Sequence, residues 1–575
     1  MKLLTSIVST ALIALGSGVS SLNAKEGPAI IDYESIHHPV VAKHGMVASQ
    51  QHLASDVGVS ILKQGGNAVD AAVATGLVLA VVLPRAGNLG GGGFMLVHLA
   101  EENKTVAIDY REVAPQAAHR ELFLGSDGTV DKQKARFSRL SAGVPGTVAG
   151  LYLAQQQYGT MEWSEVIEPA IRLAEEGFVV NWDLANQLSR RSTYMGKIPA
   201  TSKIFYKEGG DHYQAGDVLK QNDLAWSLKL LQKEGAKAFY QGEIAKKIVA
   251  DMEKNGGIIT AEDLANYKPV IRQPLSGEYR DHTVVTMPPA SSGGVHLLQM
   301  LNVLEHFPLS DFGVATADSI NLMSEAMKYA YADRSKHLGD TNFYDVPIDW
   351  LTSKSYAKKI AEKISVGQVT ASSEINAGTA PKYESPDTTH FSVVDHWGNA
   401  VSNTYTLNFS YGSGIVAEGT GILLNNEMDD FSAKPGTPNA YGLIGGEANA
   451  IEPGKRPLSS MTPTMVFKEG DLKLVTGSPG GSRIITTVLQ MVVNFVDHGM
   501  NVAEATHTPR FHHQWLPDRI FVEPAINQDT RELLEERGYE LYDSRTMGST
   551  QSIQIEDYIY GSSDPRRPNA KAAGY

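Results

Sequence analysis

The alternation of apolar and polar residues predicts two consecutive helices in the first hundred residues. Residues 49–64 have a helical pattern, and the two glycines that follow provide a helix-stop signal. Asn67 is placed to cap a second helix, which is apolar over residues 71–83 and ends before Pro84. This apolar run is too short to cross a bilayer, so we expect a buried helix.

Segments with strand and helix patterns then follow one another along the chain. Residues 94–97, 106–110 and 279–287 have strand composition, whereas residues 144–266 are mostly helical in pattern. A later helix has an apolar face that is expected to fill the core, formed by Ile320, Met323, Met327 and Ala330.

The strongest local pattern is a β-hairpin in the sequence DTTHFSVVDHWGNAVSNTYTLN. Both arms are rich in strand-forming residues, and a three-residue loop with glycine joins them. With Asp395 opposite Asn399, Thr388 faces Thr406, and opposed residues point to the same side of a sheet. Local geometry therefore places two threonine hydroxyls side by side at the open end of the hairpin. The alternative is a plain cross-strand pair on a solvated face.

Two glycine-rich stretches are candidates for ligand binding by backbone groups. A strand at 472–476, a tight turn at 477–481 and a helix follow in that order, so backbone N–H groups at the turn are placed to bind an anion. The four glycines at 90–93 lack the order of a dinucleotide fingerprint, and the chain has no P-loop lysine. We interpret them as a place where backbones pack closely beneath a site.

Composition narrows the class of protein. The 575 residues are 42% hydrophobic and 20% charged, as in a soluble globular protein, and the formal net charge of -14 argues against nucleic-acid binding. The chain has no cysteine, which excludes disulfides, thiol nucleophiles and cysteine-ligated zinc.

Residues 1–24 have the pattern of a signal peptide: an early lysine, an apolar run and small residues before a cut after Ala24. Cleavage after Ser21 is an alternative, and an uncleaved membrane anchor is a second one. The pattern predicts an exported protein, periplasmic or secreted.

Three other stretches leave alternatives open. The acids in NNEMDDFS indicate a solvated turn or a metal site, although the ligand spacing of an EF-hand is absent. Adjacent His512 and His513 would point to opposite sides of a strand, so we expect a structural role for them. Residues 364–387 are small, polar and contain proline, which indicates an exposed, mobile segment or an ordinary surface loop.

The chain also resembles a known family. The motifs TTHFSVVD, NNEMDDFS, KRPLSSMTPT and TGSPGGSR, together with AGNLGGGGFM and DYREVAP, are similar to those of the γ-glutamyltranspeptidases, which are N-terminal-nucleophile hydrolases. The resemblance implies an α+β fold, a four-layer αββα sandwich built jointly by two chains from one precursor. These would be a large subunit at 25–387 and a small catalytic subunit at 388–575.

The resemblance assigns catalytic roles. Self-cleavage between Asp387 and Thr388 would make Thr388 the nucleophile at a new chain end. Thr406 would hold its hydroxyl, and the N–H groups of Gly480 and Gly481 would form an oxyanion hole.

The resemblance also assigns binding roles for a γ-glutamyl substrate. The α-carboxylate would be held by Arg111, Ser459 and Ser460, and arginine suits this task because its planar fork donates two parallel hydrogen bonds. The α-ammonium would be held by Asn408, Glu427 and Asp430. Residues 435–453 resemble a lid loop with Tyr441 at its tip.

The implied function is γ-glutamyl transfer and glutathione hydrolysis through an ester on the threonine, resolved by water or by an amino acid or dipeptide acceptor. No cofactor or metal is implied, and the two subunits would form a heterodimer. One alternative is a β-lactam side-chain acylase that uses the same threonine; the lid and Arg111 argue against it. Another is an exported γ-glutamyl-binding protein that never cuts itself.

Overall fold

The structure, a computed structural model, describes residues 35–375, 388–434, 436, 443 and 445–575. The expected signal peptide at 1–24, Asp387 and Tyr441 lie outside the described residues, as does the second half of the polar segment 364–387.

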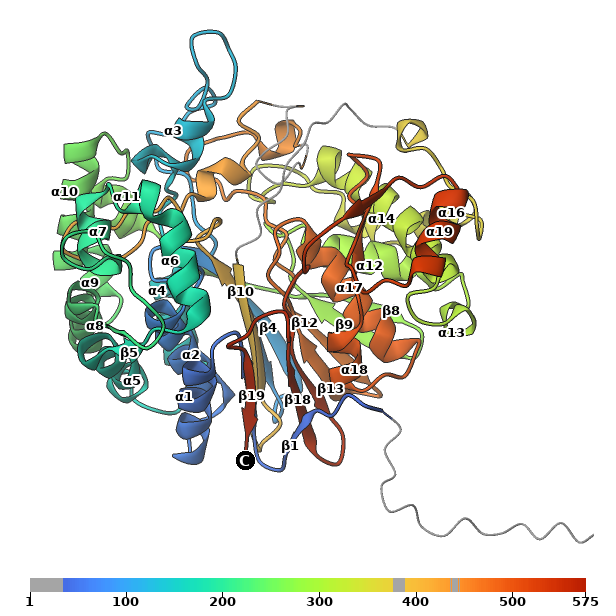
Figure 1. Cartoon of the computed structure of the whole chain (residues 1–575), viewed down its shortest axis with the longest axis horizontal. Coiled ribbons are helices and arrows are strands. Elements are labelled where there is room, and N and C mark those ends of the chain that lie inside the picture. Colours follow the sequence, from blue (N-terminus) through green and yellow to red (C-terminus); the bar gives the residue numbers. More distant parts are fainter. Residues whose placement is uncertain (1–34, 376–387, 435, 437–442, 444) are drawn as a thin grey trace, which may run out of the picture. The chain divides into compact units, whose positions relative to one another are not determined.

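Two seven-stranded antiparallel sheets lie face to face between helices (Figure 1). The first sheet has the order β19 (Lys571–Gly574), β2 (Met46–Ser49), β10 (Thr388–Val394), β11 (Ala400–Thr406), β3 (Gly92–Leu99), β4 (Lys104–Asp109), β7 (Val270–Arg272). The second has the order β1 (Val40–Ala42), β18 (Ile559–Ser563), β17 (Gln551–Ile555), β13 (Asp471–Thr476), β12 (Thr464–Lys468), β9 (His282–Thr286), β8 (Leu275–Tyr279). Each sheet therefore takes strands from both sides of residue 388.

The side chains of the hairpin β10–β11 alternate between the two faces of the first sheet. Phe391 and Val393 join the apolar core on the helix side. Ser392 and Ser402 point the other way and donate hydrogen bonds from Oγ to backbone carbonyls of β17 and β13, at 2.8 and 2.9 Å. The period of two along a strand thus gives the hairpin an apolar face and a polar face toward the second sheet.

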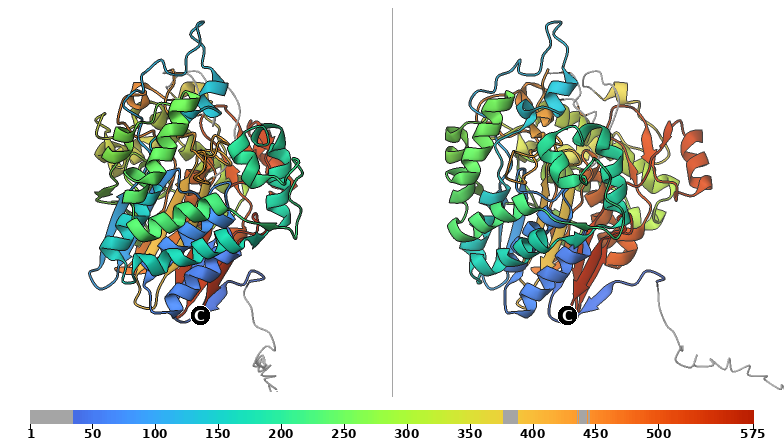
Figure 2. Two further views of the ribbon diagram at one scale, coloured as in Figure 1. Left: turned by 90° about the vertical axis from the view of Figure 1, so that its left-hand side faces the viewer. Right: turned by 60° about the vertical axis from the view of Figure 1, so that its left-hand side comes forward.

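One helix layer covers the outer face of the first sheet, and the left panel of Figure 2 looks onto it. The helices from this part of the chain are α1 (His52–Lys63), α2 (Ala68–Val82), α4 (Thr147–Tyr158), α5 (Trp163–Glu176), α6 (Trp182–Met195), α7 (Pro199–Phe205), α8 (Asn222–Glu234), α9 (Lys237–Tyr240), α10 (Glu243–Asn255) and α11 (Ala261–Asn266). Helix α2 is buried along its whole length and packs on β10 and β11, as its apolar sequence predicts.

The outer face of the second sheet packs against a second helix layer, mainly α12, α14 and α17. The helices of this half are α12 (Gly293–Leu304), α13 (Leu309–Phe312), α14 (Ala317–His337), α15 (Ile348–Leu351), α16 (Lys354–Ala361), α17 (Arg483–Val496), α18 (Val502–His507) and α19 (Gln528–Glu536). Outside the layers lie α3 (Lys132–Arg136), β5 (Phe178–Val179), β6 (Val218–Leu219), β14 (Phe511–His512), β15 (Ile520–Val522) and β16 (Leu541–Asp543). The expected four-layer αββα arrangement is confirmed.

The first expected helix begins later than its pattern indicates. Residues 46–49 form β2 and pair with β10 and β19, which requires an extended backbone there. Gln51 then caps α1, because its Oε1 accepts a hydrogen bond from the N–H of Leu53 at 2.6 Å. Sheet pairing therefore overrides helix propensity at the start of this segment.

The predicted cap of the buried helix is confirmed. Asn67 Oδ1 accepts from the N–H groups of Val69 and Asp70 at 2.9 and 3.0 Å, and Asp70 Oδ2 accepts from the N–H of Asn67 at 2.8 Å. The pair forms a reciprocal capping box that satisfies otherwise orphaned donors. In the described part of the chain, we find no helix that combines the length and apolarity needed to span a membrane.

We expect Asn67→Ala to lower the free energy of unfolding by about 1 kcal/mol, because the substitution removes the cap acceptor of α2. Thermal denaturation would show this as a lower Tm. Asn67→Ser keeps a side-chain oxygen and should retain most of the stability; equal losses in both variants would contradict the capping role.

Candidate active site

A pocket with an empty volume of about 330 Å³ opens at the end of the β10–β11 hairpin. It brings together nine residues that the sequence singled out: Arg111, Thr388, Thr406, Asn408, Glu427, Asp430, Ser459, Ser460 and Gly481. The other lining residues are Arg334, Leu443, Leu458, Met461 and Ile484. Asp387 and Tyr441 fall outside the described residues, so their predicted roles stay predictions.

The hairpin register predicted from the sequence is confirmed, since Thr388 pairs with Thr406. The Thr388 hydroxyl donates to Oγ1 of Thr406 at 3.3 Å, and the same oxygen accepts from the N–H of Asn408 at 2.8 Å. Asn408 has φ 74°, a left-handed conformation that asparagine adopts more readily than most residues. The threonine pair lies in the pocket, with Thr388 only 8% exposed, and not on a solvated sheet face.

Arg111 follows β4 and is fully buried among acids. Its Nη1 forms an ion pair with Glu427, and its Nη2 lies 2.6 Å from Asp430 Oδ2. Its Nε donates to the carbonyl of Pro457 at 3.2 Å, and Nη2 lies 3.5 Å from the carbonyl of Leu458. The guanidinium therefore connects the acidic turn to the segment just before the paired serines.

Glu112 is a buried acid that the sequence reasoning missed. Its Oε2 lies 3.6 Å from Arg111 Nη1, and neither of its carboxylate oxygens has a hydrogen-bond partner among the described residues. A Cβ on Gly92 would lie 2.6 Å from this oxygen, so only glycine leaves room for the acid. The expected close packing at the four glycines thus occurs directly behind Arg111. The sequence could have indicated this acid, because Glu112 directly follows Arg111 in the motif DYREVAP.

One arginine lies among two buried carboxyl groups and a third, that of Asp430, which is 12% exposed. Burial raises the pKa of Glu112 to about 7 and also raises the pKa values of Glu427 and Asp430, while the charge of Arg111 opposes each shift. Burial acts to lower the pKa of Arg111, but the three acids raise it above its ordinary value. The cluster carries more acid than its arginine can balance, so a further cation would be stabilised there.

The paired serines lie across the pocket on the segment before β12. Ser460 Oγ accepts from Arg334 Nη2 at 3.2 Å, and Ser459 Oγ accepts from the N–H of Met461 at 3.1 Å. Arg334, which lines the pocket, is a charged residue that the sequence reasoning missed. The sequence could have indicated it, because Arg334 continues the apolar face of α14, and a charged residue on that face becomes buried.

The glycine turn ends where α17 begins. Gly480 and Gly481 have φ values of 141° and 56°, a region that favours glycine. Within the described chain, neither N–H group donates a hydrogen bond to another backbone group. Their donors remain available at the start of a helix, where the dipole favours negative charge.

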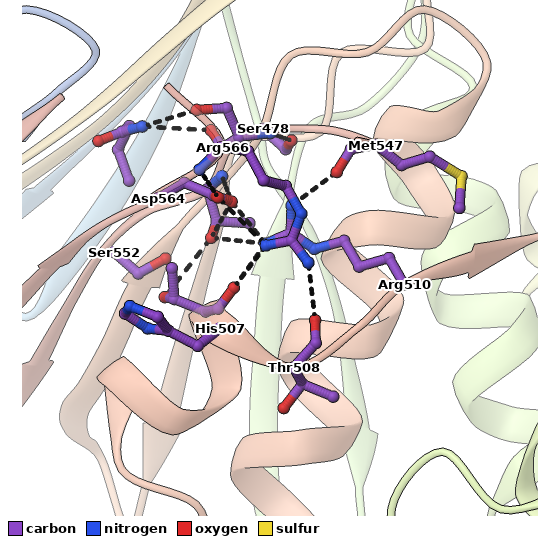
Figure 3. Close-up of polar contacts among 12 residues, drawn as sticks. Ser478, His507, Thr508, Arg510, Met547, Ser552, Asp564 and Arg566 are labelled. Carbon is purple, nitrogen blue, oxygen red and sulfur yellow. Dashed lines mark hydrogen bonds and ion pairs between the residues drawn. The ribbon is translucent and has the colours of Figure 1, made fainter. Parts of the chain in front are cut away.

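A buried charge network lies behind this turn (Figure 3). Arg510 forms an ion pair with Asp564 at 2.6 Å and donates from Nη1 to the carbonyl of Met547 at 2.7 Å (Figure 3). Two residues on, the N–H of Ser549 donates to Ser478 Oγ at 3.0 Å. The network therefore fixes the segment against which the glycine turn packs.

The two histidines lie outside the pocket and have protein partners. His512 Nδ1 lies 2.8 Å from Thr486 Oγ1, and His513 Nε2 lies 3.3 Å from Asp518 Oδ1. Among the residues that the structure describes, no group of three or more histidine and acidic side chains has the arrangement of a metal site. The cation that the acids Glu427 and Asp430 surround is Arg111.

Comparisons with known proteins agree with this geometry. A family model described as gamma-glutamyltranspeptidase matches residues 54–574. A glutathione hydrolase proenzyme of Escherichia coli (strain K12) is 54% identical over 574 residues, covering 99% of this chain and 98% of the relative. An acylase ACY 1 proenzyme of Pseudomonas sp. (strain V22) is 36% identical, covering 92% of each chain.

Two solved structures are similar to this chain over different shares of its length. A cephalosporin acylase from Bacillus halodurans superposes with a TM-score of 0.82 at 27% identity, covering 96% of this chain and 99% of the other. A Helicobacter pylori gamma-glutamyltranspeptidase chain gives a TM-score of 0.57 at 45% identity, covering 60% of this chain and 97% of the other.

If the chain cuts itself before Thr388 as the resemblance implies, we expect Thr406→Val to slow that cut by about 10- to 100-fold, because the buried Thr388 hydroxyl loses its acceptor. Denaturing gels and mass spectrometry would follow the appearance of the two fragments. Thr389→Val is the matched control, since Thr389 Oγ1 is buried and has no hydrogen-bond partner among the described residues. The same rate of cutting in both variants would rule out the role of Thr406.

Proposed function

The chain belongs to the γ-glutamyltranspeptidase family, and we propose that it is a γ-glutamyltransferase and glutathione hydrolase whose nucleophile is Thr388. The observation that carries the residue assignment is the pairing of Thr388 with Thr406 at a pocket that also contains Arg111, Glu427 and Asp430. The likeness over nearly the whole chain to a glutathione hydrolase proenzyme supports the reaction.

Maturation would begin at the same hydroxyl. Thr388 Oγ1 attacks the carbonyl carbon of Asp387, the peptide C–N bond breaks, and water hydrolyses the resulting ester. The products are a carboxyl group at Asp387 and an α-amino group at Thr388. The subunits 25–387 and 388–575 would remain together as a heterodimer, because strands of both contribute to each sheet.

The new α-amino group would be the base for turnover. A threonine hydroxyl is a weak nucleophile at its ordinary pKa, whereas a chain terminus has a pKa of about 7.7–8.0 and accepts a proton near neutral pH. Thr388 then attacks the γ-carbonyl of glutathione while its proton passes to the amine. The N–H groups of Gly480 and Gly481 would stabilise the oxyanion, where one such donor contributes about 10²–10³ in rate in other enzymes.

The reaction would proceed through a γ-glutamyl ester on Thr388. When the amide C–N bond breaks, the terminal ammonium returns its proton to the departing amine of cysteinylglycine. Water then attacks the ester to give glutamate, or an amino acid or dipeptide attacks it to give a new γ-glutamyl peptide. The amino acid and dipeptide acceptors are part of what we propose.

The charged side chains of the pocket support recognition of an α-amino acid. Glu427, Asp430 and Asn408 would receive the substrate ammonium, which balances the excess acid around Arg111. Arg111, Ser459 and Ser460 would hold the α-carboxylate. A substrate with both charges suits a pocket that has an arginine and acids side by side.

An acylase is the second candidate, because acylases are among the relatives and the solved structures that resemble this chain. The acids around Arg111 favour a zwitterionic substrate instead. A γ-glutamyl-binding protein that never cuts itself is the third candidate, and the maturation experiment below tests it.

Residues 1–24 would direct export, to the periplasm or beyond it.

We expect Thr388→Ala to remain a single uncut chain without activity, because the attacking oxygen is removed. Mass spectrometry and N-terminal sequencing of the wild type should find a fragment that begins TTHF. Thr388→Ser keeps a hydroxyl and should mature at least partly. Normal cutting of Thr388→Ala would refute the proposed nucleophile, and an intact, inactive wild type would favour the binding protein.

Arg111→Lys should raise KM for γ-glutamyl donors about 10- to 100-fold and raise it far less for simple acyl donors, because lysine cannot form the paired hydrogen bonds to a carboxylate. Steady-state kinetics with both donor classes would measure this. Arg139→Lys is the control, since Arg139 pairs with Asp251 at 2.9 and 3.0 Å and does not line the pocket. Equal losses for both donor classes would count against the carboxylate role.

A further inference from the structure

We propose that Arg334 is a positioning residue of the α-carboxylate subsite, which fixes Ser460 as a hydrogen-bond donor to the substrate carboxylate. The inference rests on the proposed function, because it concerns how this pocket selects donors that carry an α-carboxylate.

Arg334 reaches the pocket from the second helix layer. It lies near the end of α14, its side chain lines the pocket, and the residue is only 5% exposed. Its Nε donates to Ser292 Oγ at 2.8 Å, and its Nη2 donates to Ser460 Oγ at 3.2 Å. The guanidinium thus contacts two hydroxyl groups that lie on different segments.

The contact with Ser460 fixes the direction of that serine's hydroxyl proton. A guanidinium only donates, whereas a serine hydroxyl has one proton and two lone pairs. Because Ser460 Oγ accepts from Arg334, its own proton must point elsewhere, and in the described chain the hydroxyl donates to no protein acceptor. A ligand group that only accepts hydrogen bonds, such as a carboxylate, is its natural partner in the pocket.

The contact with Ser292 holds the backbone of the serine pair Ser459–Ser460. Ser292 accepts from Arg334 and passes its own proton to the carbonyl of Ser459 at 2.7 Å. The N–H of Ser292 donates to the same carbonyl at 2.8 Å. Arg334 therefore helps to hold this segment in place and also sets the direction of the Ser460 O–H.

The charge of Arg334 has no direct counter-ion in the protein. No carboxylate lies within ion-pair distance of it among the described residues, in contrast to Arg111, which pairs with Glu427 and Asp430. Burial lowers the pKa of Arg334 to about 10, so the side chain is still charged at neutral pH. A buried cation without a carboxylate partner favours an anionic group in the pocket beside it.

The test compares two donors that differ only in the α-carboxylate: a γ-glutamyl anilide and the 4-aminobutyryl anilide. For Arg334→Met we expect the preference for the carboxylate-bearing donor, as a ratio of kcat/KM values, to fall about 10- to 100-fold. The loss should appear mainly in KM, since a carboxylate contact is made before and during reaction.

A double-mutant cycle with Ser460→Ala separates positioning from an independent contribution. If Arg334 acts through Ser460, the double variant should lose little more of this preference than Arg334→Met alone. Multiplicative losses, or an unchanged preference in Arg334→Met, would overturn the inference. Lys336→Met is the control on the same helix, because Lys336 is exposed, and it should leave the preference unchanged.

Two further variants keep the test decisive if Arg334→Met does not mature. Arg334→Lys and Ser292→Ala retain the positive charge and disturb only the hydrogen bonds, and both should reduce the preference for the carboxylate-bearing donor. A wild type that prefers neither donor would refute the proposed function itself. A wild type with the preference, together with variants that keep it, would refute only the role of Arg334.

Discussion

The antiparallel pairing of β10 with β11 is the constraint on which the site depends. β2 and β3 flank the hairpin on either side within the sheet, so its register is held from both edges. At the turn, Asp395 accepts from the N–H groups of Trp397 and Asn399 and from the N–H of Ala68 at the start of α2, each at 2.9 Å. With the turn tied to the buried helix, the open end has little freedom, and Thr388 and Thr406 are held together there.

The same sandwich would let the chain keep its fold after the proposed cut before Thr388. Each sheet contains strands from both sides of Thr388, so the two products of the proposed cut would share hydrogen-bond ladders and a core. Cutting one peptide bond removes no strand pair. The described part of the structure is thus compatible with the proposed cut before Thr388, because the strand pairs that hold the pocket would remain.

Electrostatics gives the pocket its chemical character. Arg111 alone cannot neutralise Glu112, Glu427 and Asp430, and burial raises the pKa values of all three acids. Arg334 supplies a second positive charge on the side of Ser460. Positive and negative groups are therefore separated across a small volume, a pattern that complements an α-amino acid head group better than a neutral acyl chain.

Local patterns in the sequence were sufficient for the elements and for part of the site. The register of the hairpin, the cap at Asn67 and the glycine turn before α17 each depend on residues close together in the chain, where spacing alone sets geometry. The motifs shared with a family then implied the four-layer fold and most of the lining residues. The pattern was wrong at the start of α1, where pairing with distant strands decided the conformation.

Only the tertiary structure decided which charges meet. Arg111 contacts Glu427 and Asp430 from positions 316 and 319 residues away, and no local pattern specifies such contacts. The contact of Arg334 with Ser460, 126 residues away, likewise joins distant segments. Glu112 lies against Gly92 because β3 and β4 pair in one sheet. The sequence determined the hairpin and its two threonines because strand pairing across a short loop is local; the charge pattern around them arose from long-range packing.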